Sequence, residues 1–495
     1  MRKAPSTIPR ERAPAADNPL IVSVSGVRGI VGESLTPTAV CELALAYAAL
    51  LEEQGSAGPV AVARDSRPSG RMLEAAVIAG LLAAGRTVRS LGIVAAPTAA
   101  LAVADLPCAG GAMITASHNP APWNGLKFME PTGQCLPAAL MDRLAHFWRS
   151  RSFRLARHEA EFAVLPDERA TERHVEKVLE LVHVPAIRQR RFSVLLDSVH
   201  GAGGVGGRLL LERLGCRIVL DHGEPTGRFP RPPEPIAEHL DDVGKRVAES
   251  GVAIGFTQDP DADRLAIFDE SGRYLGEEYS LALAAMAILP VRPGDVAANL
   301  STSRMLDDIA ARFGVRVWRT PVGEAHVAKA MAEHACVLGG EGNGGVIHPD
   351  IVPVRDSLTG MALALDLLAR EERPLDRLVA DLPRYAMIKR KFPLPPDGVA
   401  PMLARIEESA KDARADRRDG LRLDWSDGWI HVRASNTEPA FRIVAEGRDD
   451  AAAKRLLQRA LSSLALGERP IAGNTLPILG DGSEHRADAA MGEPA

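Results

Sequence analysis

The sequence has few cysteines, and none of them lies in a disulfide-rich or zinc-binding pattern. Five are scattered through 495 residues, an odd number without a CxxC spacing. This pattern argues against a zinc knuckle and a disulfide framework, and it predicts a reducing, cytoplasmic location. The five are Cys41, Cys108, Cys135, Cys216 and Cys336.

Long hydrophobic runs and an excess of charge of one sign are also missing. No stretch approaches the ~18–20 uninterrupted apolar residues of a membrane span, so we expect no membrane association. Lys and Arg total 59 against 64 Asp and Glu, a formal net charge of −5, which argues against bulk nucleic-acid binding. Any phosphate that this chain binds should therefore lie in a local basic pocket.

The composition is otherwise that of a globular protein, with 46% hydrophobic and 4% aromatic residues. At the usual ~100–200 residues per domain, the length predicts three or four domains. Residues 1–17 and 468–495 lack an apolar core. We expect both to be flexible tails, and the first is not a signal peptide.

One unit of strand, helix and strand recurs three times. The first copy has the run PVAVARDSR, a helix over 69–84 and the run TVRSLGIVAAPT, with Leu73, Val77 and Leu81 on one face of the helix. The second has FSVLLDSVHGAGG, a helix near 205–214 and CRIVLDHGEPT; the third has DVAANLSTSR, a helix over 305–313 and VRVWRTPVG. Such units favour sheets with parallel neighbours under a cover of helices.

A third apolar run that ends in a polar loop follows each copy: AGGAMITASHNP, GVAIGFTQDPDADR and ACVLGGEGNGG. Ligands gather beyond the carboxyl ends of such strands, so three domains could aim one loop each at a shared cleft. The pattern breaks after about residue 389. We therefore predict an α/β protein with three similar mixed-sheet domains (18–165, 166–273 and 274–388) and a smaller α+β C-terminal domain (389–467) around a central cleft.

The first loop, Thr115–Pro120, is named the serine loop. Ser117 could be a nucleophile exposed on a tight turn, and an ordinary Ser-His-Asn-Pro turn is the alternative. The downstream NGLK brings Lys127 into the same loop region, where a cation could steady a phosphate or shuttle a proton.

The second loop, Asp259–Arg264, is named the metal loop. Its carboxylates stand at alternate positions after a strand and can converge on one hard cation, which we expect to be magnesium. Without a cation, the mutual repulsion of the carboxylates would be uncompensated. The spacing from Asp259 to Glu270 also matches a calcium-binding EF-hand loop. Against calcium, Arg264 stands where that loop needs glycine, and strand-like runs flank the site instead of helices.

Two further loops have side chains that suit a sugar phosphate. The sugar loop, Gly339–Gly345, is too glycine-rich for a helix or an interior strand, and Glu341 and Asn343 offer donors and acceptors for hydroxyls. The phosphate loop, Arg433–Pro439, combines a guanidinium, hydroxyls, an amide and backbone N–H groups, and Arg442 could close over the bound phosphate. A plain turn or a capped hairpin is the alternative for each.

In this order and at this spacing, the four loops resemble those of the α-D-phosphohexomutase superfamily, from about Leu20 to Gly447. The opening SVSGVRGIVGESLTP is similar to the N-terminal signature of that family, with Arg28 as its arginine. The resemblance implies four domains around a cleft, a phosphoserine enzyme and a hexose bisphosphate intermediate. It also implies one Mg²⁺ per chain, a hexose 1,6-bisphosphate activator and a sugar phosphate as the small-molecule partner of a monomer or homodimer.

The resemblance also assigns roles to residues. Ser117 would carry the phosphoryl group and, with Asp259, Asp261 and Asp263, would bind the metal. The groups implied in proton transfer or charge stabilisation are Lys127, Arg28 and Arg264. The substrate would be bound by His118, Glu341, Asn343, Arg433, Ser435, Asn436, Thr437 and Arg442.

Two departures from common bacterial members bear on the substrate. Glu324 stands where many carry a histidine after the glycine of Pro321-Val322-Gly323, and it could serve as an acid/base or cap the next helix; His326 lies two residues on. Asn343 stands where glucose, mannose and glucosamine members carry serine. With VSGVRG, the GGEGNGG form looks closer to an archaeal-type branch assigned to phosphoglucosamine mutation, so glucosamine phosphate is the expected substrate and glucose or mannose phosphate the alternative.

Two other functions remain open from the sequence. The DPDADR segment could belong to an aspartyl-phosphate phosphatase, in which Asp259 or Asp261 is the nucleophile and Ser117 is dispensable. A sugar-phosphate binder without turnover is the second. The intact serine and metal loops favour the mutase over both.

Overall fold

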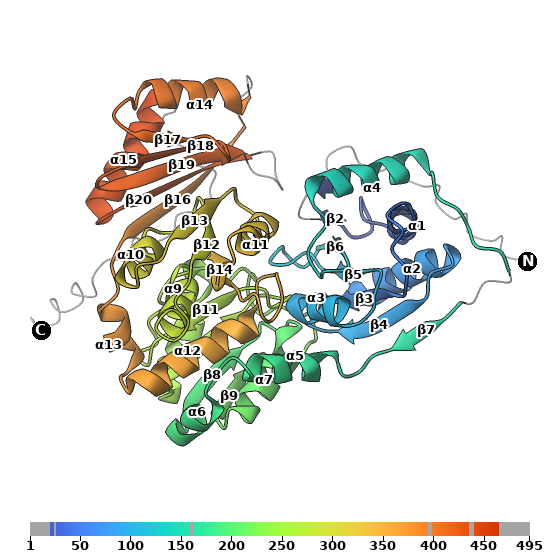
Figure 1. The fold of residues 1–495 in the computed structure, drawn as a ribbon, viewed down its shortest axis with the longest axis horizontal. Coiled ribbons are helices and arrows are strands. Elements are labelled where there is room, and N and C mark those ends of the chain that lie inside the picture. The colour runs from blue at the N-terminus through green and yellow to red at the C-terminus, as the bar shows by residue number, and fades with distance from the viewer. Residues whose placement is uncertain (1–19, 24–25, 159–161, 395–397, 435–439, 465–495) are drawn as a thin grey trace, which may run out of the picture. The chain divides into compact units, whose positions relative to one another are not determined.

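The computed structural model describes residues 20–23, 26–158, 162–394, 398–434 and 440–464, which fold as two compact units (Figure 1). The described part of the first unit comprises residues up to 302 together with 309–381. That of the second comprises 303–308 together with residues from 382 onward. Both expected tails lie outside the described residues, as do Ser435, Asn436 and Thr437 of the phosphate loop.

The first unit contains three groups of strands and helices. The first group is β1 (Ile21–Ser23), β2 (Gly26–Ile30), α1 (Pro37–Glu53), β3 (Val60–Arg64), α2 (Gly70–Ala83), β4 (Val88–Ile93), α3 (Ala96–Asp105), β5 (Gly110–Ile114), β6 (Trp123–Met129), α4 (Ala138–Ser150) and β7 (Val164–Pro166). The second group is α5 (Ala170–Leu179), α6 (Val184–Arg190), β8 (Ser193–Asp197), α7 (Gly203–Arg213), β9 (Arg217–Asp221), η1 (Ala237–His239), α8 (Asp241–Ser250), β10 (Ile254–Gln258) and β11 (Leu265–Phe268). The third group is α9 (Tyr279–Ile288), β12 (Val296–Asn299), α10 (Met305–Arg312), β13 (Val317–Thr320), α11 (Glu324–Glu333), β14 (Leu338–Glu341), β15 (Gly345–Ile347), α12 (Ser357–Glu371) and α13 (Leu375–Ala380). The first turn of α10 clusters with the second unit.

The predicted repeat is confirmed by a strand order that three sheets share. The order is β6-β5-β3-β4 in the first sheet, β11-β10-β8-β9 in the second and β15-β14-β12-β13 in the third. In each set of four, three strands run parallel and the fourth, β6, β11 or β15, is antiparallel to its neighbour. The first sheet has seven strands, with β2 and β1 beyond β6 and β7 beyond β4. The carboxyl ends of β5, β10 and β14 therefore lead into the serine, metal and sugar loops at corresponding places.

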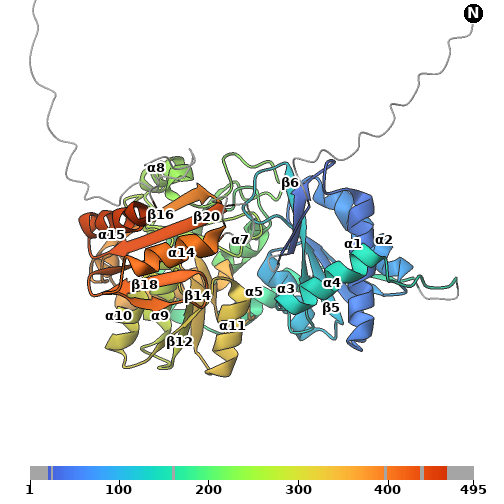
Figure 2. The same ribbon diagram turned by 90° about the horizontal axis from the view of Figure 1, so that it is seen from above.

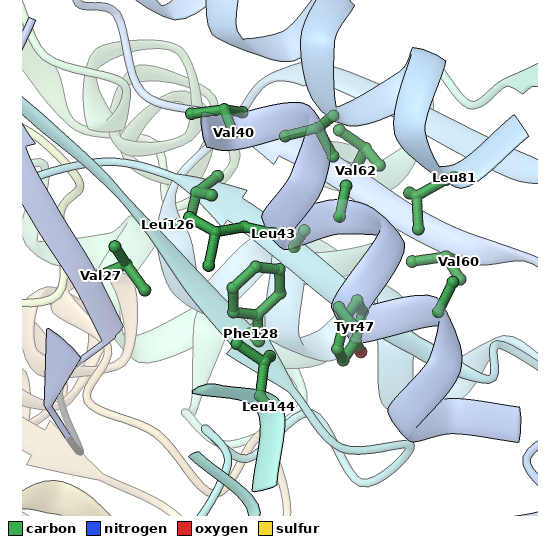
Figure 3. Close-up of a cluster of buried hydrophobic side chains, with 14 of the residues drawn as sticks. Val27, Val40, Leu43, Tyr47, Val60, Val62, Leu81, Leu126, Phe128 and Leu144 are labelled. Carbon is green, nitrogen blue, oxygen red and sulfur yellow. The ribbon is translucent and has the colours of Figure 1, made fainter. Parts of the chain in front are cut away.

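Helix α2 shows why the sequence forms these layers. Leu73, Val77 and Leu81 are fully buried, and they belong to a cluster that includes side chains of α1 and of the sheet (Figure 3). In the same cluster the rings of Tyr47 and Phe128 have centroids 4.6 Å apart, and the Tyr47 hydroxyl donates to the carbonyl of Met129. The four-residue spacing read from the sequence thus marks the buried face of the helix.

Strand β14 corrects the prediction that the glycine-rich segment cannot form an interior strand. Gly339 and Gly340 lie in β14, between β12 and β15. A Cβ on Gly339 would stand 2.3 Å from the sulfur of Met331 on α11, and one on Gly340 would stand 2.3 Å from the carbonyl oxygen of Gly345. The glycines are required by close packing on the strand, not by a turn.

A buried polar chain connects elements of different repeats. The Thr98 hydroxyl on α3 lies 2.8 Å from Nδ1 of His174 on α5, and Nε2 of that ring lies 3.1 Å from the Asp356 carboxylate. Asp356 also caps the N-terminus of α12 through the N–H groups of Leu358 and Thr359. Helices α3 and α5 lie side by side in Figures 1 and 2. These hydrogen bonds hold the segment that precedes α12 against α3 of the first repeat.

The second unit confirms the smaller α+β domain. Its elements are β16 (Ala386–Pro393), α14 (Val399–Glu408), β17 (Arg414–Asp416), β18 (Leu421–Trp425), β19 (Gly428–Ala434), β20 (Ala440–Gly447) and α15 (Asp450–Ser463). The sheet is antiparallel, in the order β16-β20-β19-β18-β17, and its core includes the stacked rings of Phe392 and Phe441. Among the described helices of both units, none has the length and apolarity to cross a membrane.

Candidate active site

The serine loop holds Ser117 in a strained and buried position. Ser117 has a φ of 52° and is 2% exposed. Left-handed backbone is uncommon for a residue other than glycine, so the surroundings must hold it. Its N–H donates to the Thr115 hydroxyl at 2.8 Å, and its carbonyl accepts from Arg67 at 2.6 Å. The loop is thus built to present the Ser117 hydroxyl.

Arg67 is a residue that sequence reasoning missed. Its guanidinium donates to the carbonyls of four residues in and next to the serine loop, Ser117, Asn119, Pro120 and Trp123. It also pairs with Asp65, which accepts from the Thr115 hydroxyl as well. The available signal was the Arg-Asp-Ser-Arg run directly after a buried strand, where charges at the carboxyl end of a strand point to a site.

We expect Arg67→Lys to loosen the serine loop. A lysine keeps the positive charge but has three donors on one atom and cannot reproduce the planar fork, so several carbonyls lose their partner. The free energy of unfolding should fall by about 2 kcal/mol, and phosphoryl-transfer turnover by about 10-fold. Denaturant unfolding and steady-state kinetics measure the two effects. Arg64→Lys, at the last residue of β3, where the arginine pairs with Glu74, is the matched control and should change turnover little.

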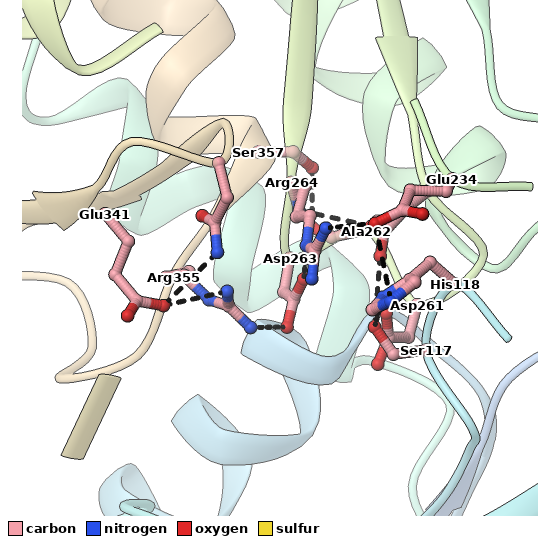
Figure 4. Close-up of polar contacts among 12 residues, drawn as sticks. Ser117, His118, Glu234, Asp261, Ala262, Asp263, Arg264, Glu341, Arg355 and Ser357 are labelled. Carbon is pink, nitrogen blue, oxygen red and sulfur yellow. Dashed lines mark hydrogen bonds and ion pairs between the residues drawn. The ribbon is translucent and has the colours of Figure 1, made fainter. Parts of the chain in front are cut away.

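The metal loop brings its aspartates together, and Asp259 contacts the Ser117 side chain; Figure 4 labels Ser117, Asp261 and Asp263. Asp259, Asp261 and Asp263 are at most 2% exposed, and one carboxylate oxygen from each lies within 4.8 Å of the others. The Ser117 hydroxyl donates to Oδ2 of Asp259 at 3.3 Å. Residues 142 positions apart in the chain therefore meet in one site.

The donor set of the metal loop fits a hard divalent cation. Oδ1 of Asp261 and Oδ1 of Asp263 are buried without a hydrogen-bond partner in the described parts of the chain. Burial and repulsion by the other two carboxylates raise the pKa of Asp259. A bound cation would relieve both costs. Strands β10 and β11 flank the loop, so the EF-hand alternative is wrong.

Lys127 lies beside the aspartates, but not in a loop as expected. It stands on β6 opposite Met113, and its ammonium donates to Asp261 at 2.8 Å and to Asp263 at 3.4 Å. Burial alone would lower the pKa of Lys127, but the two carboxylates outweigh it and raise the pKa above its usual value. This electrostatic setting favours a fixed positive charge at the site over a proton shuttle.

The other predicted cations also reach the serine and metal loops. Arg28 on β2 donates to the Asn119 side chain at 2.8 Å. Arg264 lies 3.4 Å from a carboxylate oxygen of Glu234, and that same oxygen lies 3.5 Å from Nε2 of His118. Nδ1 of His118 lies 3.3 Å from the Ser117 hydroxyl. Glu234 was not predicted, because it belongs to an irregular proline-rich segment without a strand before it.

In the sugar loop, Glu341 is held in place from several sides. Oε1 accepts from the Asn299 amide at 2.7 Å and from the N–H of Gly323 at 2.9 Å, and Oε2 accepts from Arg355 at 3.0 Å. Asn343 donates to Oε2 at 3.4 Å, while its own Oδ1 has no hydrogen-bond partner among the described residues. The loop thus holds a fixed carboxylate beside a buried amide oxygen that has no hydrogen-bond partner in the described parts of the chain.

Arg355 joins the metal loop to the sugar loop, and the sequence analysis did not single it out. Its guanidinium donates to Asp263 at 2.6 Å and to Glu341 at 3.0 Å (Figure 4). It also donates to Glu324 at 3.2 Å. The signal was an Arg-Asp pair directly before a helix. The three contacts bring the predicted metal-binding, sugar-binding and acid/base carboxylates to one buried cation.

Glu324 faces the site from the first turn of α11. Its carboxylate accepts from Arg355 and, at 3.6 Å, from the Cys135 thiol, and its charge is favourable at a helix N-terminus. It lines a small pocket with Lys127, Asp263 and Arg355. His326, two residues on, is exposed. Glu324 thus faces the site, and among the described residues no N–H group of α11 donates to its carboxylate.

The predicted phosphate-binding arginines lie in the second unit. Arg433 on β19 and Arg442 on β20 are cross-strand partners, directly next to each other in the register. Arg433 donates to Asp419 at 2.9 Å, and Arg442 is exposed. In the sequence, these two arginines stand before and after the segment that contains Ser435, Asn436 and Thr437.

Comparison with known proteins matches each part of the chain to one family. The models for phosphoglucomutase/phosphomannomutase alpha/beta/alpha domains I, II and III match residues 20–154, 172–272 and 277–385, and the model for the C-terminal domain matches 388–462. The four matches follow the chain in the order of the domains.

Relatives and a solved structure agree with the family models. A Thermococcus kodakarensis protein named phosphoglucomutase/phosphomannomutase is 38% identical over 89% of this chain and 97% of its own length. A Methanopyrus kandleri protein named probable phosphoglucosamine mutase is 36% identical over 87% and 95%. The crystal structure of a phosphoglucomutase/phosphomannomutase family protein from Burkholderia thailandensis has a TM-score of 0.81 at 26% identity, covering 91% of this chain and 98% of that one.

Proposed function

The chain belongs to the phosphoglucomutase/phosphomannomutase family of the α-D-phosphohexomutase superfamily, and on that premise we propose that it interconverts glucosamine 6-phosphate and glucosamine 1-phosphate. It is a phosphohexomutase, an enzyme that transfers a phosphoryl group within its substrate. The observation that supports a phosphoserine mechanism is the contact between the Ser117 hydroxyl and Asp259, one of the three clustered and buried aspartates.

The proposed reaction has two phosphoryl transfers. Phosphorylated Ser117 gives its phosphoryl group to the free hydroxyl of the hexose phosphate, which forms a hexose bisphosphate and leaves the serine hydroxyl. After the sugar reorients, its other phosphoryl group returns to Ser117 and the product is released. A hexose 1,6-bisphosphate would therefore activate enzyme that has lost its phosphoryl group.

The residues of the site have complementary roles in this proposal. Asp259, Asp261 and Asp263, with a Ser117 phosphate oxygen, would hold Mg²⁺, which supplies positive charge where the transferred phosphoryl oxygens develop negative charge. Lys127, Arg28 and Arg264 add fixed cations next to the serine and metal loops. His118 orients the phosphoryl group, and Glu324 exchanges the proton of the sugar hydroxyl. Burial of the serine loop limits hydrolysis by water.

The remaining residues are assigned to the substrate. Glu341 and Asn343 bind the sugar ring, and Arg433, Ser435, Asn436, Thr437 and Arg442 bind the phosphate that is not being transferred. This last assignment rests on the family resemblance. The homodimer or monomer state and the cytoplasmic location stay predictions.

Glucosamine is favoured by the acceptors in the sugar loop. An ammonium group at position 2 of the sugar has only donors, and Oδ1 of Asn343 is a buried acceptor beside the Glu341 carboxylate, without a hydrogen-bond partner among the described residues. A hydroxyl has only one hydrogen to donate, so it would satisfy fewer of these acceptors than an ammonium group. Glucose and mannose phosphates remain the alternative, because relatives at similar identity are named for both activities.

One experiment tests the substrate assignment directly. We expect kcat/KM for glucosamine 6-phosphate to exceed that for glucose 6-phosphate and mannose 6-phosphate on one enzyme preparation. Single hydrogen bonds contribute ~1–3 kcal/mol, so the preference should be about 10-fold or more. A preference for either neutral sugar above about 10-fold would overturn the glucosamine assignment but leave the mutase assignment intact.

Asn343→Ser should reduce this preference. The serine hydroxyl is shorter and does not reach as far as the amide oxygen, so the ammonium group loses an acceptor. We expect kcat/KM for glucosamine 6-phosphate to fall by about 10-fold and the values for the neutral sugars to change by less than about 3-fold. Competition assays with mixed substrates measure the ratio. An equal loss with every sugar would mean that Asn343 does not read position 2.

A further inference from the structure

In each of the three repeats, an aspartate or asparagine (an Asx residue) is either the last residue of the first strand or the residue directly after it. These residues are Asp65 after β3, Asp197 at the end of β8 and Asn299 at the end of β12. Each accepts a hydrogen bond from the backbone N–H two residues on, at 2.9, 2.8 and 2.9 Å respectively. All three are at most 4% exposed. Each thus forms an Asx turn that starts the loop after the strand.

The remaining side-chain atoms of these Asx residues bind different partners. Asp65 pairs with the guanidinium of Arg67. Asp197 pairs with Arg231 at 3.0 Å and Arg246 at 3.1 Å, so both aspartates face arginines. In contrast, the Nδ2 atom of Asn299 donates to Oε1 of Glu341 at 2.7 Å.

The residue type at each position follows the charge of its partner. A carboxylate suits the two positions that face guanidinium groups, whereas at the third position it would stand against the buried Glu341 carboxylate. An amide avoids that repulsion and supplies the donor that Oε1 needs. Asn299 is therefore chemically matched to Glu341, and not merely to the turn.

Asn299 also connects the sugar loop to its neighbours. Its Oδ1 accepts from the Thr302 hydroxyl at 3.0 Å, and the Thr302 oxygen in turn accepts from the N–H of Gly342 at 3.0 Å. Oε1 of Glu341 is completed by the N–H of Gly323. Because Asn299 and Gly323 donate to Oε1, the other carboxylate oxygen, Oε2, accepts from Arg355 and Asn343. Oδ1 of Asn343, which is buried and has no hydrogen-bond partner among the described residues, belongs to this same side chain.

From this network we propose that Asn299 is a positioning residue that fixes the Glu341 carboxylate for recognition of the sugar. The inference rests on the proposed function of Glu341 as a sugar-binding group. Asn299 does not touch the reacting atoms. It acts through Glu341 and through the turn that starts at Thr302.

Asn299→Asp tests the proposal because it keeps the shape and the Asx turn but places a carboxylate against Glu341. We expect KM for the hexose phosphate that the enzyme turns over to rise by at least about 10-fold, with less than about 3-fold change in kcat, since ring recognition is affected more than phosphoryl transfer. In the Glu341→Gln background the same substitution should cost less than about 3-fold, because the glutamine amide can donate to the aspartate.

The outcomes separate positioning from a general structural effect. An equal rise in KM in both Glu341 backgrounds, or an equal fall in kcat alone, would overturn the proposal. Asn124→Asp, which introduces a carboxylate at another buried asparagine, is the control and should cost the same in both backgrounds.

A second readout covers variants with low activity and keeps the proposed function separate. The melting temperature should fall for Asn299→Asp and recover when Glu341→Gln is added, whatever the substrate. Recovery of the melting temperature in the double variant would support the Asn299–Glu341 coupling. If the unmodified protein showed no mutase turnover, the proposed function would be contradicted while the coupling still stood. Absence of recovery would contradict the coupling itself.

Discussion

Replacing Ser117 by alanine is expected to lower mutase turnover by at least about 10³-fold, because it removes the group proposed to carry the phosphoryl between the two transfers. The substitution removes one buried hydroxyl that donates to Asp259 and leaves the Arg67 contacts to the backbone of the loop intact. The protein should therefore stay folded. Coupled assays of hexose 1-phosphate formation, with a bisphosphate activator present, measure the loss.

Ser66→Ala is a suitable control for this experiment. Ser66 is 3% exposed in the same region, and its hydroxyl has no hydrogen-bond partner among the described residues. We expect its turnover to stay within about 2-fold of the unmodified enzyme. Turnover retained by Ser117→Ala would instead point to an aspartate as the nucleophile, as in an aspartyl-phosphate phosphatase.

Removal of the divalent cation is expected to have the second largest effect. In the proposed mechanism a cation bound at the metal loop would contribute several kcal/mol to stabilisation of the transferred phosphoryl, so chelation should lower turnover by at least about 10²-fold, and Mg²⁺ should restore it. Mg²⁺ should also raise the melting temperature, because it relieves repulsion among three buried carboxylates and binds only the folded site.

Asp261→Asn separates the metal from a general salt effect. Asp261 combines a buried, unpartnered Oδ1 with an ion pair to Lys127, so its amide variant should lose most of the Mg²⁺-dependent rise in melting temperature and most of the turnover. Asp269 lies outside this cluster and pairs with Arg273. Asp269→Asn should therefore keep the Mg²⁺-dependent rise in melting temperature. An unchanged response in Asp261→Asn would place the cation elsewhere.

The sequence predicted the parts of this site that lie directly after strands of the repeat. Ser117, the metal-loop aspartates and Glu341 each follow or end the third strand of a copy, so strand periodicity and a local motif located them together. The predicted helix over 69–84 is found as Gly70–Ala83 for the same reason, because its buried residues recur four apart.

Residues that act over a long distance in the chain were harder to predict. Arg67 and Arg355 bind groups 50 to 56 and 14 to 92 positions away, respectively, and no local spacing announces such partners. The glycines of β14 were misassigned to a turn because their reason is contact with Met331 and Gly345, which only the packed structure shows. The sequence predicts a loop at Lys127 because the short NGLK run does not show the apolar alternation of a strand, although it belongs to the antiparallel strand β6.

The most direct test of the account is the position of the phosphoryl group on the enzyme. After incubation with a hexose 1,6-bisphosphate, mass spectrometry of the digested protein should find one phosphoryl group on Ser117, and excess hexose 6-phosphate should remove it. A phosphoryl group on Asp259 or Asp261, or full turnover by enzyme that never becomes phosphorylated, would contradict the phosphoserine mechanism.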